Sequence, residues 1–524
     1  MRRCHVGDAV QEFRPGTCHA GVPRVGVDKV HSAHRARHRQ VRRKHVQHGI
    51  VVDKAWIALG VRSRTAARGA EAVDADIDRA GGKRCGQELD VDAASAVHLR
   101  REFPGEQPDA ESVRLEFVHG MSIIGRMATA TSADLRRVNV ARALRAIHRS
   151  GGEISRSQLA RELQCTRATA AALVRDLSAM ELASERPAPA TGRRGRPTTT
   201  LVPAGAGPVV VALEAGIEQV RLATVTIGGV LTDAIDVPVP DPSVAAVRKT
   251  GRRLLTRRLK ELDRRCVGVG VAAYGPVEAS TGVLLEAPHL GWRDVDMKAL
   301  LTIPSGLAFT VDNVANLIAL ADSVRGIGRG HRTVLYIHAG IGVGGTLVHE
   351  GVPVRGRIGI AGEYGHLPFG LDGLACRCGA TGCWETEVDQ RALVRLAGKR
   401  GAGIGLNAAA RAVFDDAGLG RAKAVRAVQR TAARFGRGLA ALIAVHDPDA
   451  VVLAGHAADL LEHAPEAVGS ALQEHVLAPY RRDLPLVRST PLGNDAALIG
   501  AAEQLFTTLL SDPVPGRQLP VTRQ

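Results

Sequence analysis

Three cysteines and a histidine crowd into one short stretch of the chain. The segment GHLPFGLDGLACRCGATGCWE holds Cys376, Cys378 and Cys383 within eight residues, and His366 lies ten residues before the first of them. Thiolate and imidazole are the ligands that zinc prefers, and three cysteines with one histidine form a common closed structural site. Glycines between the cysteines let the backbone turn tightly around one ion. We therefore predict that these four residues bind Zn²⁺; the alternative is a loop with three reduced cysteines.

A second group of polar residues lies at the start of a predicted helix. The segment ISRSQLARELQCTRATAAALVRDLSAMELA predicts two short helices, because Ser155 with Gln158 fits a capping box and Thr166 fits an N-cap. Two helices joined by a three- or four-residue turn form a helix-turn-helix, whose second helix meets base edges with its N-terminal end. Arginine pairs with guanine, and threonine contacts a thymine methyl group or a phosphate. We predict DNA contacts at Thr166, Arg167 and Thr169; a small helical packing domain is the alternative.

Arginines gather directly after this helix pair. The segment ATGRRGRPTTT (190–200) sets Arg193, Arg194 and Arg196 among glycines and a proline. A short arginine cluster flanked by glycines can lie in the minor groove of DNA. We expect this segment to be the wing of a winged helix, and a solvated linker is the alternative.

The composition excludes several classes of protein. With 524 residues, 45% hydrophobic and 23% charged, the chain is not a disordered polymer. No run approaches the roughly 18 apolar residues of a membrane-spanning helix, and the basic start lacks the apolar core of a secretory signal. The net charge of +16 favours a polyanionic partner, most often nucleic acid. Eight cysteines are too few for a disulfide scaffold, so we expect a cytoplasmic protein.

The first 126 residues show no periodicity that would bury a core. Residues 1–50 carry 11 Lys and Arg against 3 Asp and Glu, together with seven histidines. A DNA-binding arm, a metal-binding tract, a disordered tail and a true start at Met121 or Met127 all fit this composition. We favour a disordered or wrongly assigned leader and give it no function.

After residue 205, apolar runs that end in glycine alternate with amphipathic stretches. Strands are predicted for VVVALEAG, VRLATVTIGG, VGVGVAAYGPV, LAFTVDN, TVLYIHAGIGVGG and AVVLAGH, and helices for ANLIALADSVRG, QRALVRLAGKR, 424–445 and 494–510. This alternation predicts an α/β architecture with largely parallel central strands.

In their order and spacing, these motifs resemble the ROK family of repressors, open reading frames and sugar kinases. The resemblance covers about residues 131–510 and rests on SRSQLARELQCTRATAAALVRDL, GRRGRP, VAAYGPVEASTGVLLEAPHLGW, VDNVANLIALAD, AGIGVGGTLVHEGVPVRGRIGIAGEYGH and CRCGATGCWE. Within the family, the sequence most resembles the DNA-binding regulators, the NagC/XylR-type repressors. It implies an α/β fold class, in which an N-terminal winged helix-turn-helix domain precedes a two-lobed actin-like, ribonuclease-H-like sugar-kinase-type domain with the ligand in its cleft.

The predicted domains follow from these matches. They are a leader (1–126), a helix-turn-helix DNA-binding domain (128–186), a basic wing and linker (187–204), a ROK-type α/β domain (205–510) and a tail (511–524).

The sequence departs from the family's kinases at two places that phosphoryl transfer needs. The first phosphate loop, Asp-x-Gly-Gly-Thr in kinases, is Glu-Ala-Gly-Ile-Glu here, so Ile217 blocks the backbone from phosphate and Glu218 repels it. The second loop, 340–345, is intact. The catalytic Asp of Glu-Asn-Asp-Ala-Asn is Val314, which cannot accept a proton. We therefore predict no kinase activity.

The resemblance also carries over four sugar-contact positions: Asn313, Glu363, His366 and Glu385. In the family, the glutamate and histidine of Gly-Glu-x-Gly-His bind sugar hydroxyls, and the histidine also binds zinc. Carboxylates suit this task because they accept hydrogen bonds from paired hydroxyls. For Glu363 and Glu385 the alternative is support of the zinc loop. His289 stands where the family often has an asparagine, which leaves the identity of the sugar open.

These residues together predict a cytoplasmic transcriptional regulator that acts as a repressor. Its partners would be a double-stranded DNA operator and a small-molecule sugar effector, and it would act as a homodimer or homotetramer. A sugar in the cleft would shift the two lobes and lower operator affinity. Two alternatives stay open: an active, glucokinase-like ROK kinase with an appended DNA-binding module, and a regulator that has lost effector binding.

Overall fold

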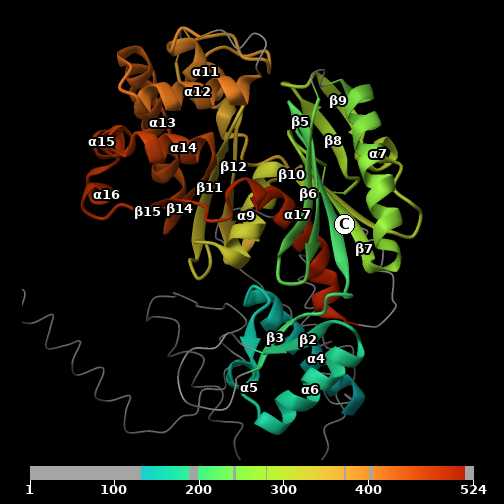
Figure 1. Ribbon diagram of the computed structural model, residues 1–524. Coiled ribbons are helices and arrows are strands. Elements are labelled where there is room, and N and C mark those ends of the chain that lie inside the picture. Colours follow the sequence, from blue (N-terminus) through green and yellow to red (C-terminus); the bar gives the residue numbers. More distant parts are fainter. Residues whose placement is uncertain are drawn as a thin grey trace, which may run out of the picture. The chain divides into compact units, whose positions relative to one another are not determined.

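The computed structural model describes residues 132–187, 199–239, 243–278, 280–370, 373–399 and 405–513 (Figure 1). The predicted leader (1–126), most of the predicted tail, and the wing residues Arg193, Arg194 and Arg196 lie outside the described residues. Among the helices of the described ranges, none combines the length and the apolar character needed to cross a membrane.

The first described elements are three helices and a three-stranded antiparallel sheet. They are α4 (Ser132–Arg149), β1 (Ile154–Ser155), α5 (Arg156–Leu163), α6 (Arg167–Ala179), β2 (Ala183–Pro187) and β3 (Thr199–Pro203), and the sheet has the order β1-β3-β2.

Local hydrogen bonds explain why α5 and α6 begin and end where they do. The Ser155 hydroxyl accepts from the Gln158 backbone N–H at 3.2 Å, and the Gln158 side chain accepts from the Ser155 N–H at 2.9 Å, as in the predicted capping box. The left-handed backbone of Gln164 (φ 54°) ends α5. The Thr166 hydroxyl then accepts from the Thr169 N–H at 3.1 Å and caps α6. Each of the two caps matches its sequence prediction.

The first lobe of the following α/β region is a five-stranded sheet with helices on both faces (Figure 1). Its order is β10-β7-β4-β5-β6, from β4 (Val209–Ala215), β5 (Gln219–Thr226), β6 (Leu231–Pro238), β7 (Cys266–Ala273) and β10 (Ala308–Asn313). Alternate residues of β4 explain the two layers: Val211 and Leu213 pack with α7 (Val244–Leu262), whereas Val210 and Ala212 pack with α17 (Ala496–Ser511). The 3-10 turn η3 (Asp263–Arg265), the hairpin β8 (Val283–Ala287) and β9 (Trp292–Asp296), and α8 (Met297–Leu301) complete this lobe.

The second lobe repeats the plan with a sheet of order β13-β12-β11-β14-β15. Its strands are β11 (Thr333–Ala339), β12 (Val343–His349), β13 (Val352–Pro353), β14 (Ala450–Gly455) and β15 (Leu486–Ser489). Its helices are α10 (Glu385–Val388), α11 (Gln390–Leu396), α12 (Leu406–Gly418), α13 (Ala422–His446), α14 (His456–His463), α15 (Pro465–His475) and α16 (Ala478–Arg482), with the 3-10 turns η4 (Tyr364–His366) and η5 (Gly493–Asp495).

Two sequence predictions about these sheets need correction. Parallel pairing joins β4, β7 and β10, and joins β11, β14 and β15, but β5, β6, β12 and β13 pair antiparallel, so the sheets are mixed rather than largely parallel. The stretch 333–345, predicted as one strand, contains β11 and the start of β12. Its glycines form the turn between them, where the Gly340 N–H donates to the Gly342 carbonyl at 2.8 Å.

Two helices connect the lobes. Helix α9 (Val314–Arg325) packs against α17 and also lies on β11 and β12 of the second sheet. The α9 and α17 backbones touch, because a Cβ on Gly500 would lie 1.9 Å from the Leu317 carbonyl oxygen. Asn313, the last residue of β10, caps the start of α9, so this helix begins at the carboxyl end of the first sheet.

Candidate functional site

The four predicted metal ligands come together in the second lobe. The side-chain ligand atoms of His366, Cys376, Cys378 and Cys383 all lie within 4.8 Å of one another. The Cys378 and Cys383 Sγ atoms are 3.7 Å apart, and His366 Nδ1 is 3.7 Å from Cys376 Sγ. A tetrahedral zinc with Zn–S bonds of about 2.3 Å separates two sulfurs by roughly 3.8 Å. The cluster therefore fits a metal ion of this kind.

Glycine makes the tight loop around these ligands possible. The Cys376 N–H donates to the Ala380 carbonyl at 2.8 Å and closes the turn that brings the cysteines together. Gly382 has φ +76°, and a Cβ there would lie 1.9 Å from the Gly370 carbonyl oxygen. A larger residue would therefore push the loop away from the ligand cluster.

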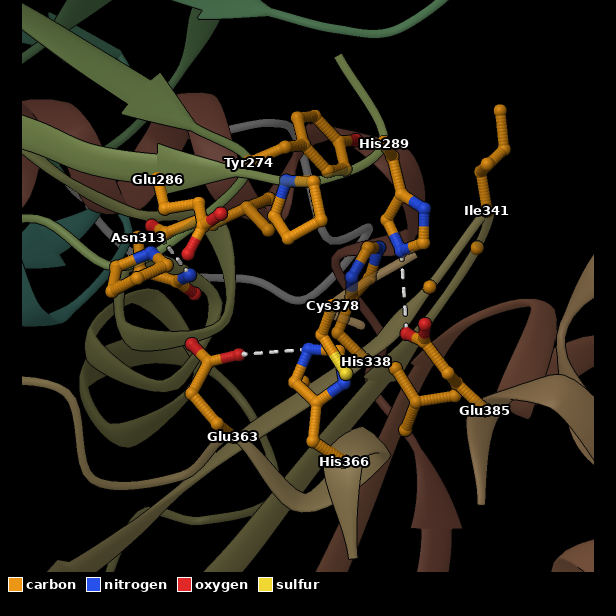
Figure 2. A pocket seen from close by; sticks show the side chains of 18 of the residues that line it. Tyr274, Glu286, His289, Asn313, His338, Ile341, Glu363, His366, Cys378 and Glu385 are labelled. Carbon is orange, nitrogen blue, oxygen red and sulfur yellow. Dashed lines mark hydrogen bonds and ion pairs between the residues drawn. The ribbon is translucent and has the colours of Figure 1, made fainter. Parts of the chain in front are cut away.

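A pocket opens beside this cluster, between the two sheets (Figure 2). It encloses about 840 Å³ of empty space when its open mouth is included. Both lobes contribute to its wall. The lining includes Ile217, Tyr274, Glu286, His289, Asn313, Val314, His338, Ile341, Glu363, His366, Cys378 and Glu385. All four predicted sugar contacts are thus in one pocket, together with Val314 and Ile217.

Glu385 lies between the cysteine cluster and the pocket. One carboxylate oxygen accepts from the Cys376 thiol at 3.0 Å, and the other is 3.3 Å from His289 Nε2. Burial opposes ionisation, but the hydrogen bond and the charge of His289 lower the pKa of Glu385 below its ordinary value. Glu385 therefore contacts a metal ligand and lines the pocket at once, so the geometry is compatible with sugar contact and with support of the zinc loop.

His366 also lies between the two sites. Its Nδ1 faces the Cys376 sulfur, whereas its Nε2 is 3.9 Å from a Glu363 carboxylate oxygen (Figure 2). Burial, and secondarily the charge of Glu385, raise the pKa of Glu363. A metal on Nδ1 would fix the imidazole ring with Nε2 toward the pocket.

Asn313 and Val314 mark the first-lobe side of the pocket. The Asn313 side chain accepts from the Ala315 N–H at 2.8 Å and donates to the Gly275 carbonyl at 2.9 Å, so its orientation is fixed. The Asn313 amide oxygen can still accept one hydrogen bond from a ligand, and its NH₂ group can still donate one. Val314 is 5% exposed and offers only methyl groups where the resemblance expects a catalytic Asp.

The residues of the first phosphate loop have contacts of their own. Glu214 is buried, accepts from the Tyr274 hydroxyl at 2.7 Å and pairs with Arg221 at 3.3 Å. Burial raises its pKa despite these partners. Glu218 accepts from the backbone N–H groups of Leu406 and Asn407 at the start of α12, across the two lobes. A carboxylate already bonded to these donors leaves less room for a phosphate.

The second glycine loop packs closely at the pocket floor. A Cβ on Gly342 would lie 2.6 Å from His289 Nε2, and one on Gly345 would lie 2.4 Å from the Tyr336 carbonyl oxygen. Close packing against backbone thus accounts for Gly345, whereas the His289 ring beside Gly342 can move aside.

The predicted DNA contacts of α6 are in a separate part of the chain from the pocket. Thr166, Arg167 and Thr169 are exposed around the first turn of α6, and the two threonine hydroxyls are 2.9 Å apart. The strands β2 and β3 follow α6 as an antiparallel pair on either side of the segment 188–198, which is outside the described residues.

Several residues in or beside the pocket have no predicted role in the sequence. Tyr274, Glu286 and His338 line it, and burial lowers the pKa of His338 to about 4, which keeps its imidazole neutral. Arg221 joins Glu214 to Asp495, a residue 274 positions away. Tyr274 and Glu286 lie within the motif VAAYGPVEASTGVLLEAPHLGW, but nothing in its residue types marks them as pocket residues, and only spatial proximity reveals His338 and Arg221.

Comparison with known proteins agrees with this architecture. Residues 210–507 match the ROK family. A glucokinase of Streptomyces coelicolor is 32% identical over 251 residues, which cover 45% of this chain and 79% of that protein. A putative xylose repressor of Caldicellulosiruptor sp. is 33% identical over 201 residues, covering 36% of this chain and 50% of the repressor.

A solved structure extends the match beyond the family region. The crystal structure of a ROK family transcriptional regulator, a homologue of the E. coli MLC protein, superposes with a TM-score of 0.55 at 22% identity. It covers 72% of this chain and 97% of that chain. At this identity the likeness concerns the fold, a ROK sugar-kinase-like α/β fold with two lobes. From the family match and the relatives, we conclude that the chain belongs to the ROK family, with a likeness to its NagC/XylR-type members.

Proposed function

We propose that this protein is a DNA-binding transcriptional repressor whose α/β domain binds a sugar. The carrying observation is the helix pair α5–α6, with Thr166, Arg167 and Thr169 exposed at the start of the second helix, joined to a pocketed ROK domain. The following antiparallel strands fit a winged helix, and Arg193, Arg194 and Arg196 would belong to the wing that the sequence predicts. Relatives described as xylose repressors, and a neighbour described as a ROK transcriptional regulator, support the proposal.

In this proposal the protein binds DNA as a homodimer or homotetramer, which supplies two copies of α6. Two copies of α6 would enter successive major grooves of a pseudo-palindromic operator, about one helical turn or a multiple apart. Binding to the phosphates would release counterions, so operator affinity would fall steeply with salt. We expect the protein to bind its operator in the cytoplasm.

Selection of bound fragments from a genomic library tests the proposal. The full-length protein is expected to enrich a small set of fragments that share a pseudo-palindromic site. Retention of DNA without any shared site, or no retention at all, would exclude a sequence-specific regulator.

The pocket favours an effector without negative charge. Its described lining contains Glu286, Glu363 and Glu385 but neither lysine nor arginine. Glu286 is paired with Arg293 at 2.9 Å, whereas Glu385 and Glu363 face the imidazoles of His289 and His366 at 3.3 and 3.9 Å. Glu363 and Glu385 would repel a phosphate or carboxylate group on the sugar and would accept hydrogen bonds from hydroxyls.

We accordingly expect D-glucose or D-xylose to bind at least about 30-fold more tightly than glucose 6-phosphate, a difference of about 2 kcal/mol. Isothermal titration calorimetry measures each affinity. The Glu363→Gln variant should narrow the difference because it removes one of the repelling charges. Equal or tighter binding of the phosphorylated sugar would contradict the proposed effector class.

We further propose that the domain does not phosphorylate its sugar. Val314 supplies no base, Ile217 lines the pocket where phosphate would approach, and Glu218 is bonded to α12. An active kinase with an appended DNA-binding module is the second candidate. It draws support from the glucokinase relatives and from the intact glycine loop 340–345.

A coupled ADP-release assay separates these candidates. With ATP, Mg²⁺ and D-glucose or D-xylose, turnover is expected to lie below about 10⁻³ s⁻¹, at least about 1,000-fold under typical kinase rates. Val314→Asp alone should stay inactive because Ile217 and Glu218 still obstruct the phosphate. Sugar-dependent turnover by the wild-type protein at kinase rates would favour the second candidate.

Zinc is our proposal for the ion held by His366, Cys376, Cys378 and Cys383, because the donor set and the distances suit it. Its part would be structural: it would hold the loop and fix the His366 ring, while the sugar contacts come from the side chains.

A further inference from the structure

A buried group of three charged or polar side chains connects α4, which belongs to the helix-turn-helix region, with the α/β domain. His148, Arg325 and Glu503 come from α4, α9 and α17, and their side chains are 2%, 8% and 4% exposed. His148 Nε2 and a Glu503 carboxylate oxygen are 2.6 Å apart, and Arg325 Nε donates to the other oxygen at 2.7 Å. We call these three residues the interdomain cluster.

The interdomain cluster also contacts the backbone on both sides. An Arg325 guanidinium N–H donates to the His148 carbonyl at 3.1 Å, and the Gly228 N–H, between β5 and β6, donates to His148 Nδ1 at 3.1 Å. The Gly228 N–H thus makes Nδ1 the accepting nitrogen of the ring, and Nε2 faces both Glu503 and the Arg325 guanidinium, at 2.6 and 2.9 Å. Gly228 is packed against Gly152, because a Cβ added to Gly228 would lie 3.1 Å from the Gly152 backbone. These contacts leave little freedom for α4 to move independently.

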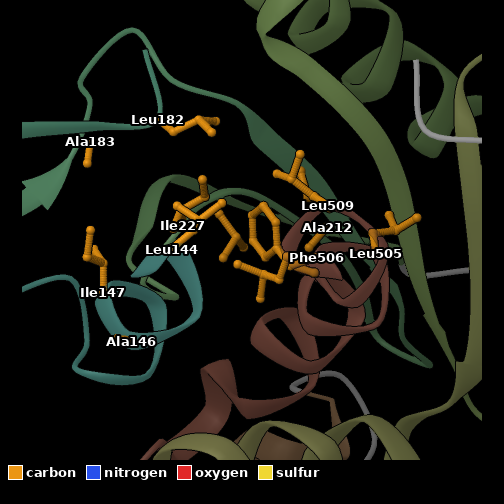
Figure 3. Close-up of a cluster of buried hydrophobic side chains, with 14 of the residues drawn as sticks. Leu144, Ala146, Ile147, Leu182, Ala183, Ala212, Ile227, Leu505, Phe506 and Leu509 are labelled. Atoms are coloured by element: carbon orange, nitrogen blue, oxygen red, sulfur yellow. The ribbon is translucent and has the colours of Figure 1, made fainter. Parts of the chain in front are cut away.

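Apolar side chains surround the interdomain cluster and exclude water. Leu144 and Ile147 of α4 pack with Ile227, Phe506 and Leu509 in one buried group (Figure 3). The His148 ring lies edge-on to Phe506, with ring centroids 5.6 Å apart. In such a setting, an ion pair that loses one partner leaves a buried charge without compensation. The cluster therefore favours one fixed arrangement of α4, α9 and α17.

Helix α9 runs from the sugar pocket to the interdomain cluster. Asn313 caps its first turn and lines the pocket, Val314 is its first residue, and Arg325 is its last. Twelve helical residues span about 18 Å. Residues 314–319 are buried without interruption, and the backbone contact between Leu317 and Gly500 ties α9 to α17. A displacement at the pocket end is therefore carried to Arg325 rather than absorbed by bending.

We infer that α9 and the interdomain cluster couple sugar binding to the DNA-binding helices. In this arrangement, a sugar that contacts Asn313 shifts the first turn of α9, Arg325 moves with it, and the altered contacts to Glu503 and His148 reposition α4. The sugar and the operator DNA would then favour different arrangements of the same element, α9 with the interdomain cluster. Coupling between distant sites requires such a shared element. This inference rests on the proposed function and names the residues through which regulation passes.

The test compares operator affinity with and without sugar in the full-length chain. Fluorescence anisotropy measures the affinity for a genomic fragment enriched by the wild-type protein, in buffer and with saturating D-glucose or D-xylose. For the wild type we expect the sugar to weaken binding at least tenfold. In Glu503→Gln, which keeps the side-chain shape, this change is expected to fall to about twofold or less. The sugar affinity itself should stay within about threefold, which also shows that the domain is folded.

Glu350→Gln is the matched control. Glu350 also pairs with an arginine, Arg332, at 3.2 Å, but both side chains are exposed, so the coupling should equal that of the wild type. If Glu503→Gln does not fold, Arg325→Lys gives a second reading, because it keeps the charge but loses the several N–H donors of arginine.

The outcomes separate the two proposals. A wild type that binds no shared site, or whose operator affinity no sugar changes, would contradict the proposed function and this inference with it. A wild type that responds at least tenfold, beside folded Glu503→Gln or Arg325→Lys variants that respond equally, would overturn this inference alone.

Discussion

Replacement of Arg167 by alanine is expected to weaken operator binding by roughly 30-fold to 10⁴-fold. A bidentate arginine–guanine pair contributes about 1–3 kcal/mol, and a dimer contains two copies of α6, which gives about 2–6 kcal/mol. Arg167 is exposed at the first turn of α6, whose cap is supplied by Thr166, so its removal should leave the helix intact. Anisotropy titration of an enriched fragment at fixed salt measures the change.

Arg253→Ala is the control for loss of one positive charge. Arg253 is exposed on α7 of the first lobe, and its replacement should change operator affinity by less than about threefold. If the Arg167→Ala protein binds the fragment as tightly as the wild type, α6 does not form part of the DNA interface. A loss that is equal for every DNA sequence would show that Arg167 contacts phosphate rather than a base.

Replacement of Cys383 by serine is expected to release the metal and weaken sugar binding. A serine hydroxyl is a poor zinc ligand, and Cys383 is 1% exposed within the cluster, so solvent cannot easily replace the lost bond. Without the metal, His366 is no longer fixed toward the pocket. A hydrogen bond between a neutral imidazole and a hydroxyl contributes about 0.5–1.5 kcal/mol, so sugar affinity should fall roughly 2-fold to 12-fold.

Elemental analysis and calorimetry on the same preparations check both parts of this expectation. The wild type should contain one zinc per chain and Cys383→Ser almost none. Cys165→Ser is the control, because Cys165 is half-buried in the turn between α5 and α6, outside the ligand cluster. Zinc retained in full by Cys383→Ser, or sugar affinity that does not depend on zinc content, would contradict the assigned ligands or their link to the pocket.

The parts of the structure that the sequence predicted are those with a local signal. The capping box of Ser155 and Gln158 and the N-cap of Thr166 depend on residues three positions apart, and both were identified. The cysteine cluster is equally local, with Gly382 marking the tight turn. Strands β4 and β11 were recognisable from continuous apolar runs, as expected for buried strands.

Contacts between distant residues left no such signal. His148 and Glu503 are 355 positions apart, and Glu218 meets α12 from 188 positions away. Charged residues at these places look like ordinary surface residues in the sequence, and only burial distinguishes them. The pairing direction of β5 and β12 was missed for a related reason: an apolar strand has the same pattern in parallel and antiparallel neighbours. Helix α7 was missed although Val247, Leu254 and Leu255 do follow helical spacing, because its many arginines hide the apolar face.

The central claim, a sugar-responsive repressor, is tested most directly by one titration. The full-length protein is titrated onto an enriched genomic fragment with and without saturating D-glucose or D-xylose, at several salt concentrations. We predict tight binding that weakens with salt in proportion to the phosphates contacted, and a further loss of at least tenfold with the sugar. Binding that no sugar changes, or that does not distinguish the fragment from random DNA, would contradict the claim.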